Sequence, residues 1–174
     1  DWNHRFVPVP PTVIHDQIQA ALRSQTIRTT KVGMLGHPDT IRVVADALKS
    51  QEWDNVVLDP VLICKGQEPG QALDTDNALR TQVLPLATVT TPNLFEAQTL
   101  SGMDSITTVE ELVEAAKRIA AQGPRYVVAK GGVDLPGEDA VDVLWDGQAA
   151  TIYRAKKVGR EKVSGAGCTL AAAI

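Results

Sequence analysis

Short apolar segments typical of β-strands alternate with helical segments along most of the chain. The most apolar is 55–64, NVVLDPVLIC, and strand character recurs at 29–35, 88–92 and 125–132. This alternation predicts an α/β fold with a mainly parallel sheet and helices on both faces. Ligands bind such folds at the carboxyl ends of the strands, so the residues that follow each strand are the first candidates for a site.

Apolar residues at helical spacing and helix-start signals predict the helices between the strands. Thr107 or Thr108, with Glu110 or Glu111, forms a capping box at the start of one of them. The expected helices are 10–25, 37–48, 77–87, 93–102, 109–123 and 165–174.

Two connections stand out between these elements. The stretch 65–76 is rich in turn-forming residues and is expected to be a loop, long enough for a flap or lid. The segments 140–147 and 150–158 are expected to form a hairpin around Asp146-Gly147.

Length and charge limit the classes of protein that the chain can represent. It has 174 residues, which suits a single domain, and a net charge of −4, which speaks against nucleic-acid binding. No apolar run approaches the roughly 20 residues that span a bilayer. The chain starts at Asp1 and ends within an expected helix, so residues 1–174 are interpreted as one incomplete domain. The composition favours a cytoplasmic protein with free thiols at Cys64 and Cys168.

A glycine-rich turn, Gly165-Ala166-Gly167, stands directly before Cys168 at the start of the last helix. Backbone N–H groups at a helix N-terminus attract anions, and the helix dipole favours a thiolate there, which can act as base or nucleophile. The alternative is a tightly packed helix start with a small buried cysteine.

Polar residues follow two of the expected strands. Asn93 and Glu96 lie on one helical face, where they fit a phosphate and a metal-bound water, or form an ordinary N-cap with a first-turn acid. Asp59 ends the most apolar strand and is either a cap for the next loop or a site residue.

Two lysines beside glycines leave similar alternatives. Lys65 follows Cys64 and could reach a phosphate or be solvated, and Lys130-Gly131-Gly132 could border a nucleotide or form a tight strand exit. Neither sequence is a P-loop or a dinucleotide-binding fingerprint. The three histidines show no metal-ligand spacing.

Several segments together resemble the ribokinase-like vitamin kinases, in particular the hydroxymethylpyrimidine-phosphate kinases and their pyridoxal-kinase relatives. The matching segments, in the order of the family, are KVGMLG, VVLDPVLICKG, LPLATVTTPNLFEAQTLSGM, VVAKGG, AVDVLWDG and GAGCTLAAAI. The resemblance implies a three-layer ribokinase-like fold that lacks its N-terminal substrate-binding segment and its C-terminal helices. It also implies ATP-dependent phosphorylation of a hydroxymethyl group on a small heteroaromatic ring.

The resemblance also implies a role for each motif. Gly165, Ala166 and Gly167 form the anion hole, and Cys168 is the base. Asp59, Glu96 and Lys65 serve the phosphates and Mg²⁺, whereas Gly33, Met34 and Cys64 border the substrate. The residues implied to border ATP are Asn93, Lys130, Gly131, Gly132, Val133, Asp134, Asp142, Gly167 and Ala172.

Cys64 favours pyridoxal as the substrate, because a thiol can add reversibly to its aldehyde and hydroxymethylpyrimidine has none. The alternatives are a thiamin-pathway pyrimidine kinase and a non-catalytic vitamin-binding module, and Cys64 itself could simply pack at the base of the flap. The resemblance further implies a small-molecule substrate, a homodimer and a cytoplasmic location.

Overall fold

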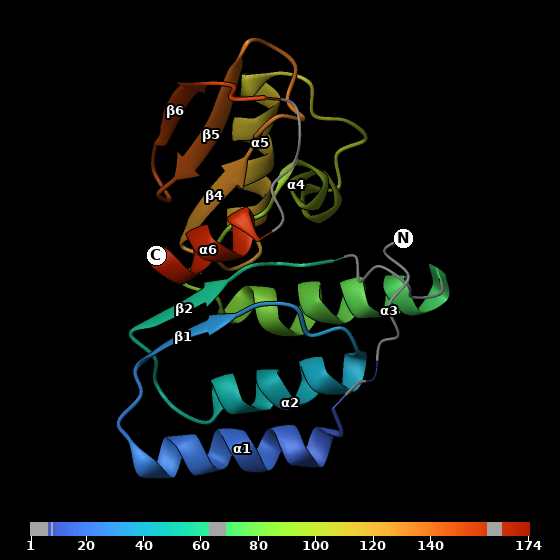
Figure 1. Ribbon diagram of the computed structural model, residues 1–174, viewed down its shortest axis with the longest axis vertical. Helices are drawn as coiled ribbons and strands as arrows, with labels where there is room; N and C mark the ends of the chain where they lie inside the picture. Colours follow the sequence, from blue (N-terminus) through green and yellow to red (C-terminus); the bar gives the residue numbers. More distant parts are fainter. Residues whose placement is uncertain (1–6, 8, 63–68, 160–164) are drawn as a thin grey trace.

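Four short strands lie side by side in parallel and form most of the sheet. A computed structural model describes residues 7, 9–62, 69–159 and 165–174. Within that part of the chain the strands pair in sequence order, so the sheet runs from β1 to β6 (Figure 1). The parallel strands are β1 (Thr29–Val32), β2 (Asn55–Leu58), β3 (Val89–Thr90) and β4 (Tyr126–Lys130). Their carboxyl ends therefore meet at one edge.

A hairpin completes the sheet. β5 (Asp139–Trp145) and β6 (Ala150–Lys156) continue it in antiparallel pairing. The carboxylate of Asp146 accepts the N–H groups of Gln148 and Ala149 at 2.8 and 2.7 Å, which closes the turn. The predicted hairpin is confirmed.

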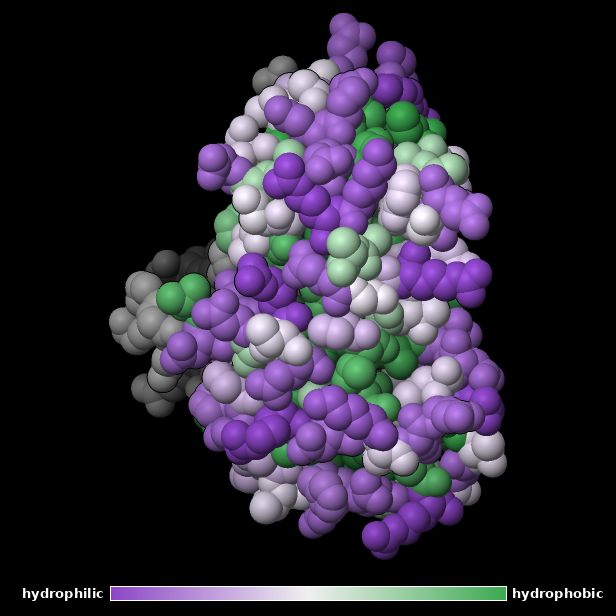
Figure 2. Space-filling model, turned by 180° about the vertical axis from the view of Figure 1, so that it is seen from behind, coloured by the Kyte–Doolittle hydropathy of each residue, from purple (hydrophilic) through white to green (hydrophobic). Residues whose placement is uncertain are grey.

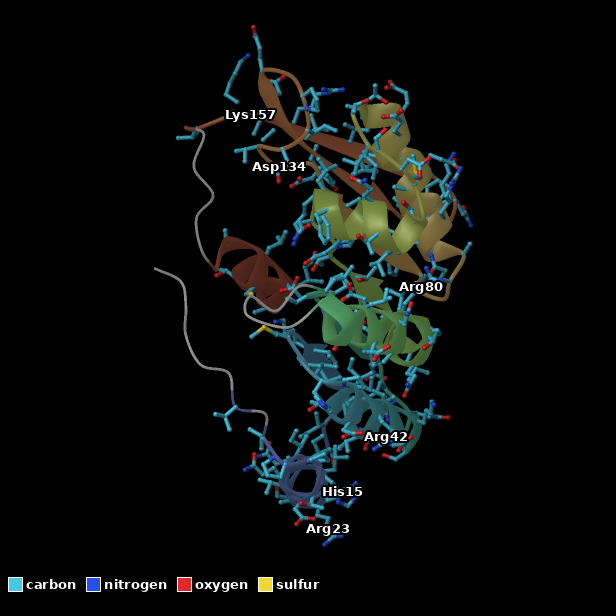
Figure 3. The ribbon with its side chains drawn as sticks, turned by 90° about the vertical axis from the view of Figure 1, so that its right-hand side faces the viewer. His15, Arg23, Arg42, Arg80, Asp134 and Lys157 are labelled. Atoms are coloured by element: carbon cyan, nitrogen blue, oxygen red, sulfur yellow. The ribbon has the colours of Figure 1, made fainter. Side chains whose placement is uncertain are left out.

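The helices occupy two groups along the sheet (Figure 1). α1 packs on α2 beside the β1 end, whereas α5 packs on β4 and β5 and α4 packs on α5. Figure 3 shows α6 on the side of the molecule away from α4 and α5. The helix bounds are α1 (Pro11–Ser24), α2 (Pro38–Lys49), α3 (Pro69–Ala78), α4 (Leu94–Ser101), α5 (Val109–Ala120) and α6 (Ala166–Ala173).

The core fills the space between the helices and the sheet. α5 buries Leu112 and Ile119 completely, against a sheet that buries Val127 of β4 and Val143 of β5. On the other side of the core, α2 buries Ile41. The face in Figure 2 is mostly hydrophilic, with hydrophobic side chains between the polar ones. None of the helices described is both long and apolar enough to cross a membrane.

One expected loop is wrong in part. Residues 69–76, expected to continue the loop that starts at 65, belong to α3, which runs on as a π-helical turn (Leu79–Val83) and a 3₁₀ turn (Leu84–Leu86). Thr75, Leu79 and Val83 are buried at helical spacing, so packing favours helix where the turn-forming composition predicted a loop.

Candidate active site

Asp59 lies at the centre of the sheet edge where the parallel strands end. It directly follows β2, and its N–H donates to the carbonyl of Val32 at 2.9 Å, which extends the β1–β2 pairing by one residue. Thr91, the residue after β3, lies close enough for its hydroxyl to approach Asp59 Oδ1 at 3.5 Å. The side chain of Asp59 is 5% exposed, so its charge needs partners.

Two lysines supply these partners. Lys31 Nζ lies 3.9 Å from Asp59 Oδ2, and Lys130 Nζ lies 3.9 Å from Oδ1. Both distances exceed that of a hydrogen bond, and neither ammonium donates one to any residue in the described part of the chain. The two ammonium groups therefore balance the charge of Asp59 without hydrogen bonding to its carboxylate.

Asn93 and Glu96 form a reciprocal capping box at the start of α4. The N–H of Asn93 donates to Glu96 Oε2 at 2.8 Å, and the N–H of Glu96 donates to Asn93 Oδ1 at 2.9 Å. The pKa of Glu96 is raised to about 7, chiefly because the carboxyl group is buried. The hydrogen bond from the Asn93 N–H and the charge of Lys130 oppose this rise, and the charge of Asp59 contributes to it. The predicted N-cap with a first-turn acid is confirmed, and the binding of a phosphate by Asn93 and of a metal-bound water by Glu96 stays a prediction.

The glycine-rich start of α6 comes next to this cluster. Gly165 has φ of +86° and is the N-cap, and a Cβ at Gly167 would lie 3.1 Å from Lys130 Nζ. Cys168 is exposed and its thiol is free of any disulfide. The structure thus brings the predicted anion hole beside the lysine and carboxylates that follow the strands.

The turn after β4 is held tightly on the sheet. The N–H of Gly131 donates to the carbonyl of Val141 at 2.9 Å, and a Cβ at Gly131 would overlap that carbonyl oxygen. Gly132 has φ of +53°, and Lys157 Nζ donates to the carbonyl of Val133 at 3.3 Å. The two glycines are explained by the backbone geometry of this turn, in addition to any role beside a nucleotide.

The remaining candidates lie around this edge or outside the described residues. Asp142 is the cross-strand partner of Lys130, and Gly33 follows β1 directly. Met34 is 61% exposed, and Asp134 and Ala172 are also exposed, so their roles beside substrate and ATP stay predictions. Cys64 and Lys65 fall on residues that the structure does not describe.

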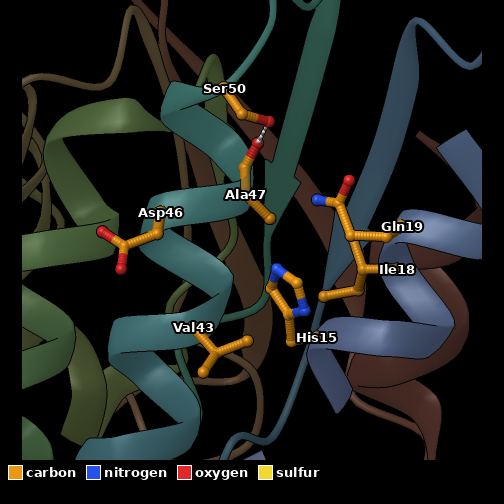
Figure 4. A pocket seen from close by; sticks show the side chains of 7 residues that line it. All are labelled: His15, Ile18, Gln19, Val43, Asp46, Ala47 and Ser50. Atoms are coloured by element: carbon orange, nitrogen blue, oxygen red, sulfur yellow. Dashed lines mark hydrogen bonds between the residues drawn. The ribbon is translucent and has the colours of Figure 1, made fainter. Parts of the chain in front are cut away.

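A separate cavity of about 210 Å³ lies between α1 and α2 (Figure 4). His15, Ile18 and Gln19 of α1 face Val43, Asp46 and Ala47 of α2 and its C-cap residue Ser50 across it. It shares no residue with the Asp59 cluster. Among the described residues no three His, Cys, Asp or Glu side chains come together as a metal cage.

The whole chain matches one family. The sequence profile described as phosphomethylpyrimidine kinase covers residues 1–174. The chain belongs to this family. Its resemblance to the vitamin kinases and its ribokinase-like fold are confirmed.

Several similar proteins are pyridoxine or pyridoxal kinases of bacteria. The chain is 43% identical over 173 residues to pyridoxine kinase of Bacillus subtilis, with 99% of the chain and 64% of the relative covered. An ADP complex of Bacillus subtilis pyridoxal kinase has a TM-score of 0.91 at 44% identity, with the same coverage. Staphylococcus aureus pyridoxal kinase with AMP-PCP and pyridoxal has a TM-score of 0.85 at 34% identity, covering 99% of this chain and 61% of that one. The chain thus spans less than two thirds of these relatives' length.

Lys31 is a residue of this edge that the sequence did not single out. A lysine within a short strand is ordinarily a solvated residue, and its contact with Asp59 crosses from β1 to the end of β2. The signal that could have found it is its place two residues before Gly33, in a strand that ends at the same edge as β2.

Proposed function

We propose that the full-length protein is a kinase that transfers the γ-phosphoryl group of ATP to the 5-hydroxymethyl group of pyridoxal. The observation that carries this proposal is the position of Lys130 Nζ, 3.9 Å from Asp59 and 3.1 Å from where a Cβ of Gly167 would be. It places a glycine-rich helix N-terminus, a cation and a buried carboxylate around one point. This combination suits phosphoryl transfer, since catalysis of that reaction rests on positioning and on charge stabilisation.

The nucleotide would lie over the turn after β4 and the start of α6. The B. subtilis and S. aureus relatives in complex with ADP and AMP-PCP support ATP as the phosphoryl donor. The residues expected to border it are Asn93, Lys130, Gly131, Gly132, Val133, Asp134, Asp142, Gly167 and Ala172. The N–H groups at the start of α6 would receive the transferred phosphoryl group.

The transfer itself is a displacement at phosphorus. The oxygen of the substrate hydroxymethyl group attacks the γ-phosphorus, its proton passes to Cys168 Sγ, and the bond from that phosphorus to the β–γ bridging oxygen breaks. ADP leaves with the electron pair. Lys130 and the N–H groups of Gly165, Ala166 and Gly167 stabilise the negative charge on the transferred oxygens.

The carboxylates at this edge suit Mg²⁺. This ion binds one or two carboxylates together with phosphate oxygens and water, and Asp59 and Glu96 provide such oxygens beside the proposed phosphate position. When bound, Mg²⁺ would neutralise charge on the phosphates. Lys65 is proposed to reach the same phosphates.

Pyrimidine phosphorylation is the second candidate, because the matching family profile carries that description. Gly33 and Met34 would border the ring of either substrate.

Cys64 separates the two candidate substrates, since its thiol could add to the aldehyde of pyridoxal as a hemithioacetal. Cys64→Ala is expected to slow pyridoxal turnover more than pyrimidine turnover, and equal losses would remove this role.

The direct test supplies the full-length protein with ATP, Mg²⁺ and either pyridoxal or hydroxymethylpyrimidine, and measures phosphorylated product. Faster turnover of pyridoxal is expected. Preference for the pyrimidine would select the second candidate. Failure with both, alongside normal pyridoxal binding, would instead identify a non-catalytic vitamin-binding module.

Assembly and location are part of the proposal. We expect a homodimer in the cytoplasm, as is implied by the resemblance to this family. Sedimentation analysis of the full-length protein should give twice the mass of one chain, and a monomer would contradict the dimer.

A further inference from the structure

Lys31 completes a symmetrical arrangement around Asp59. Lys31 faces Oδ2 and Lys130 faces Oδ1, each at 3.9 Å, so one buried carboxylate lies between two ammonium groups. The side chain of Lys31 is 32% exposed, compared with 14% for Lys130 and 5% for Asp59. Lys31 therefore approaches the carboxylate from the more open side.

Each lysine lies over a glycine. A Cβ at Gly33 would come within 2.7 Å of Lys31 Nζ, and a Cβ at Gly167 would come within 3.1 Å of Lys130 Nζ. Neither glycine has a positive φ, so the backbone conformation does not require glycine at either position. The absence of a side chain at Gly33 leaves room for the ammonium group of Lys31, and its absence at Gly167 leaves room for that of Lys130.

We infer that Lys31 is a positioning residue that fixes the carboxylate of Asp59 from the Gly33 side, and that Gly33 provides the space for it. With Lys31 in place, attraction on Oδ2 balances attraction on Oδ1, and Lys130 is not drawn into a closer pair with Asp59. Without it, the carboxylate and Lys130 are free to close on each other, which moves Lys130 away from the start of α6. This inference rests on the proposed kinase function of the same edge.

The kinetic test compares Lys31→Met with the wild-type full-length protein. We expect kcat to fall by about tenfold or more, as is typical when a group that orients a site residue is lost. The KM for pyridoxal should change by about twofold at most, because Lys31 acts through Asp59. Lys31→Arg keeps the charge and should recover part of the loss. Lys49→Met, at an exposed end of α2, controls for the removal of one positive charge.

Three outcomes would overturn the inference: a wild-type kcat for Lys31→Met, a change in KM alone, or a Lys31→Arg variant as slow as Lys31→Met.

Gly33→Ala provides an independent test, because its methyl group would displace the ammonium without removing it. A Cβ at Gly33 lies 3.8 Å from Lys31 Cε, an ordinary contact, so the conflict is with the ammonium itself. We expect Gly33→Ala to lower kcat as Lys31→Met does, and the double variant to be no slower than the slower single one. Losses that multiply would show that Gly33 acts independently of Lys31.

A measurement without turnover separates this inference from the proposed function. The shifts in urea midpoint caused by Lys31→Met and Asp59→Asn should not add in the double variant, since each change removes the same contact. Additive shifts would overturn the inference. A wild-type protein that phosphorylates neither substrate would count against the kinase function. The comparison of urea midpoints for the single and double variants would still decide whether Lys31 holds Asp59.

Discussion

Glu96 and Asn93 satisfy each other's backbone at the start of α4, with an N–H to carboxylate distance of 2.8 Å in one direction and an N–H to amide oxygen distance of 2.9 Å in the other. The side chain of Glu96 is buried, because the residue is only 6% exposed. Burial outweighs the two favourable partners, Asn93 and Lys130, and raises the pKa of Glu96 from 4.5 to about 7. The carboxyl group therefore holds its proton more strongly in the folded chain than in the unfolded one.

Glu96→Gln should flatten the pH dependence of stability. The folded pKa lies above the unfolded value, so stability from this group is present below pH 4.5 and is lost as the pH rises through about 7. Relative to the variant, the free energy of unfolding of the metal-free wild type should fall by roughly 3 kcal/mol between pH 4 and pH 8. Urea unfolding at both pH values measures this. Parallel curves for the two proteins would refute it.

Lys130→Met should slow phosphoryl transfer and raise the pKa of Glu96. Lys130 is mostly buried beside Asp59 and lowers the pKa of Glu96. We expect kcat/KM for ATP to fall about a hundredfold, because a phosphate-binding cation is lost. The loss of the cation should also move the acid limb of the pH–rate profile to higher pH.

Lys49→Met is the matched control for this variant, because Lys49 is an exposed lysine on α2 and makes no ion pair with the described residues. A lower rate with an unmoved acid limb would show that Lys130 does not act on Glu96.

The strand-end residues could be predicted from the sequence because parallel strands end at one edge. Asp59, Asn93, Glu96 and Lys130 each follow or end a strand segment, and the structure brings them together. The capping boxes and the hairpin turn depend on residues close in sequence, so their positions could be predicted within one residue.

Contacts between distant side chains could not be predicted in this way. Lys31 looks like a solvated lysine until the sheet places it across from Asp59. The helical character of 69–76 could not be predicted either, because it depends on burial of Thr75 with Leu79 and Val83, which outweighs a composition typical of loops. In both cases the deciding contact comes from outside the local sequence.

Thr108→Ala should destabilise the protein through the start of α5. The hydroxyl of Thr108 accepts the N–H of Glu111 at 3.2 Å, and Glu111 Oε2 accepts the N–H of Thr108 at 3.1 Å. Loss of the cap should lower the free energy of unfolding by about 1 kcal/mol. Thr99→Ala makes the same chemical change inside α4, where alanine is the better helix former, and should be neutral or slightly stabilising. Equal effects in urea unfolding would show that capping does not contribute at Thr108.

Cys168→Ala tests the proposed base at the start of α6. Gly165 is the N-cap, so Cys168 occupies the third helical position, exposed and close to the glycines that would hold the phosphoryl group. Alanine favours helix, so the backbone N–H groups should stay in place. We expect kcat to fall by about a hundredfold or more through loss of the base, while the Kd of ADP measured by calorimetry stays within about twofold. A normal kcat would remove Cys168 as the base. If ADP binding were lost instead, the thiol would be shaping the anion hole, since proton transfer plays no part in binding the product nucleotide.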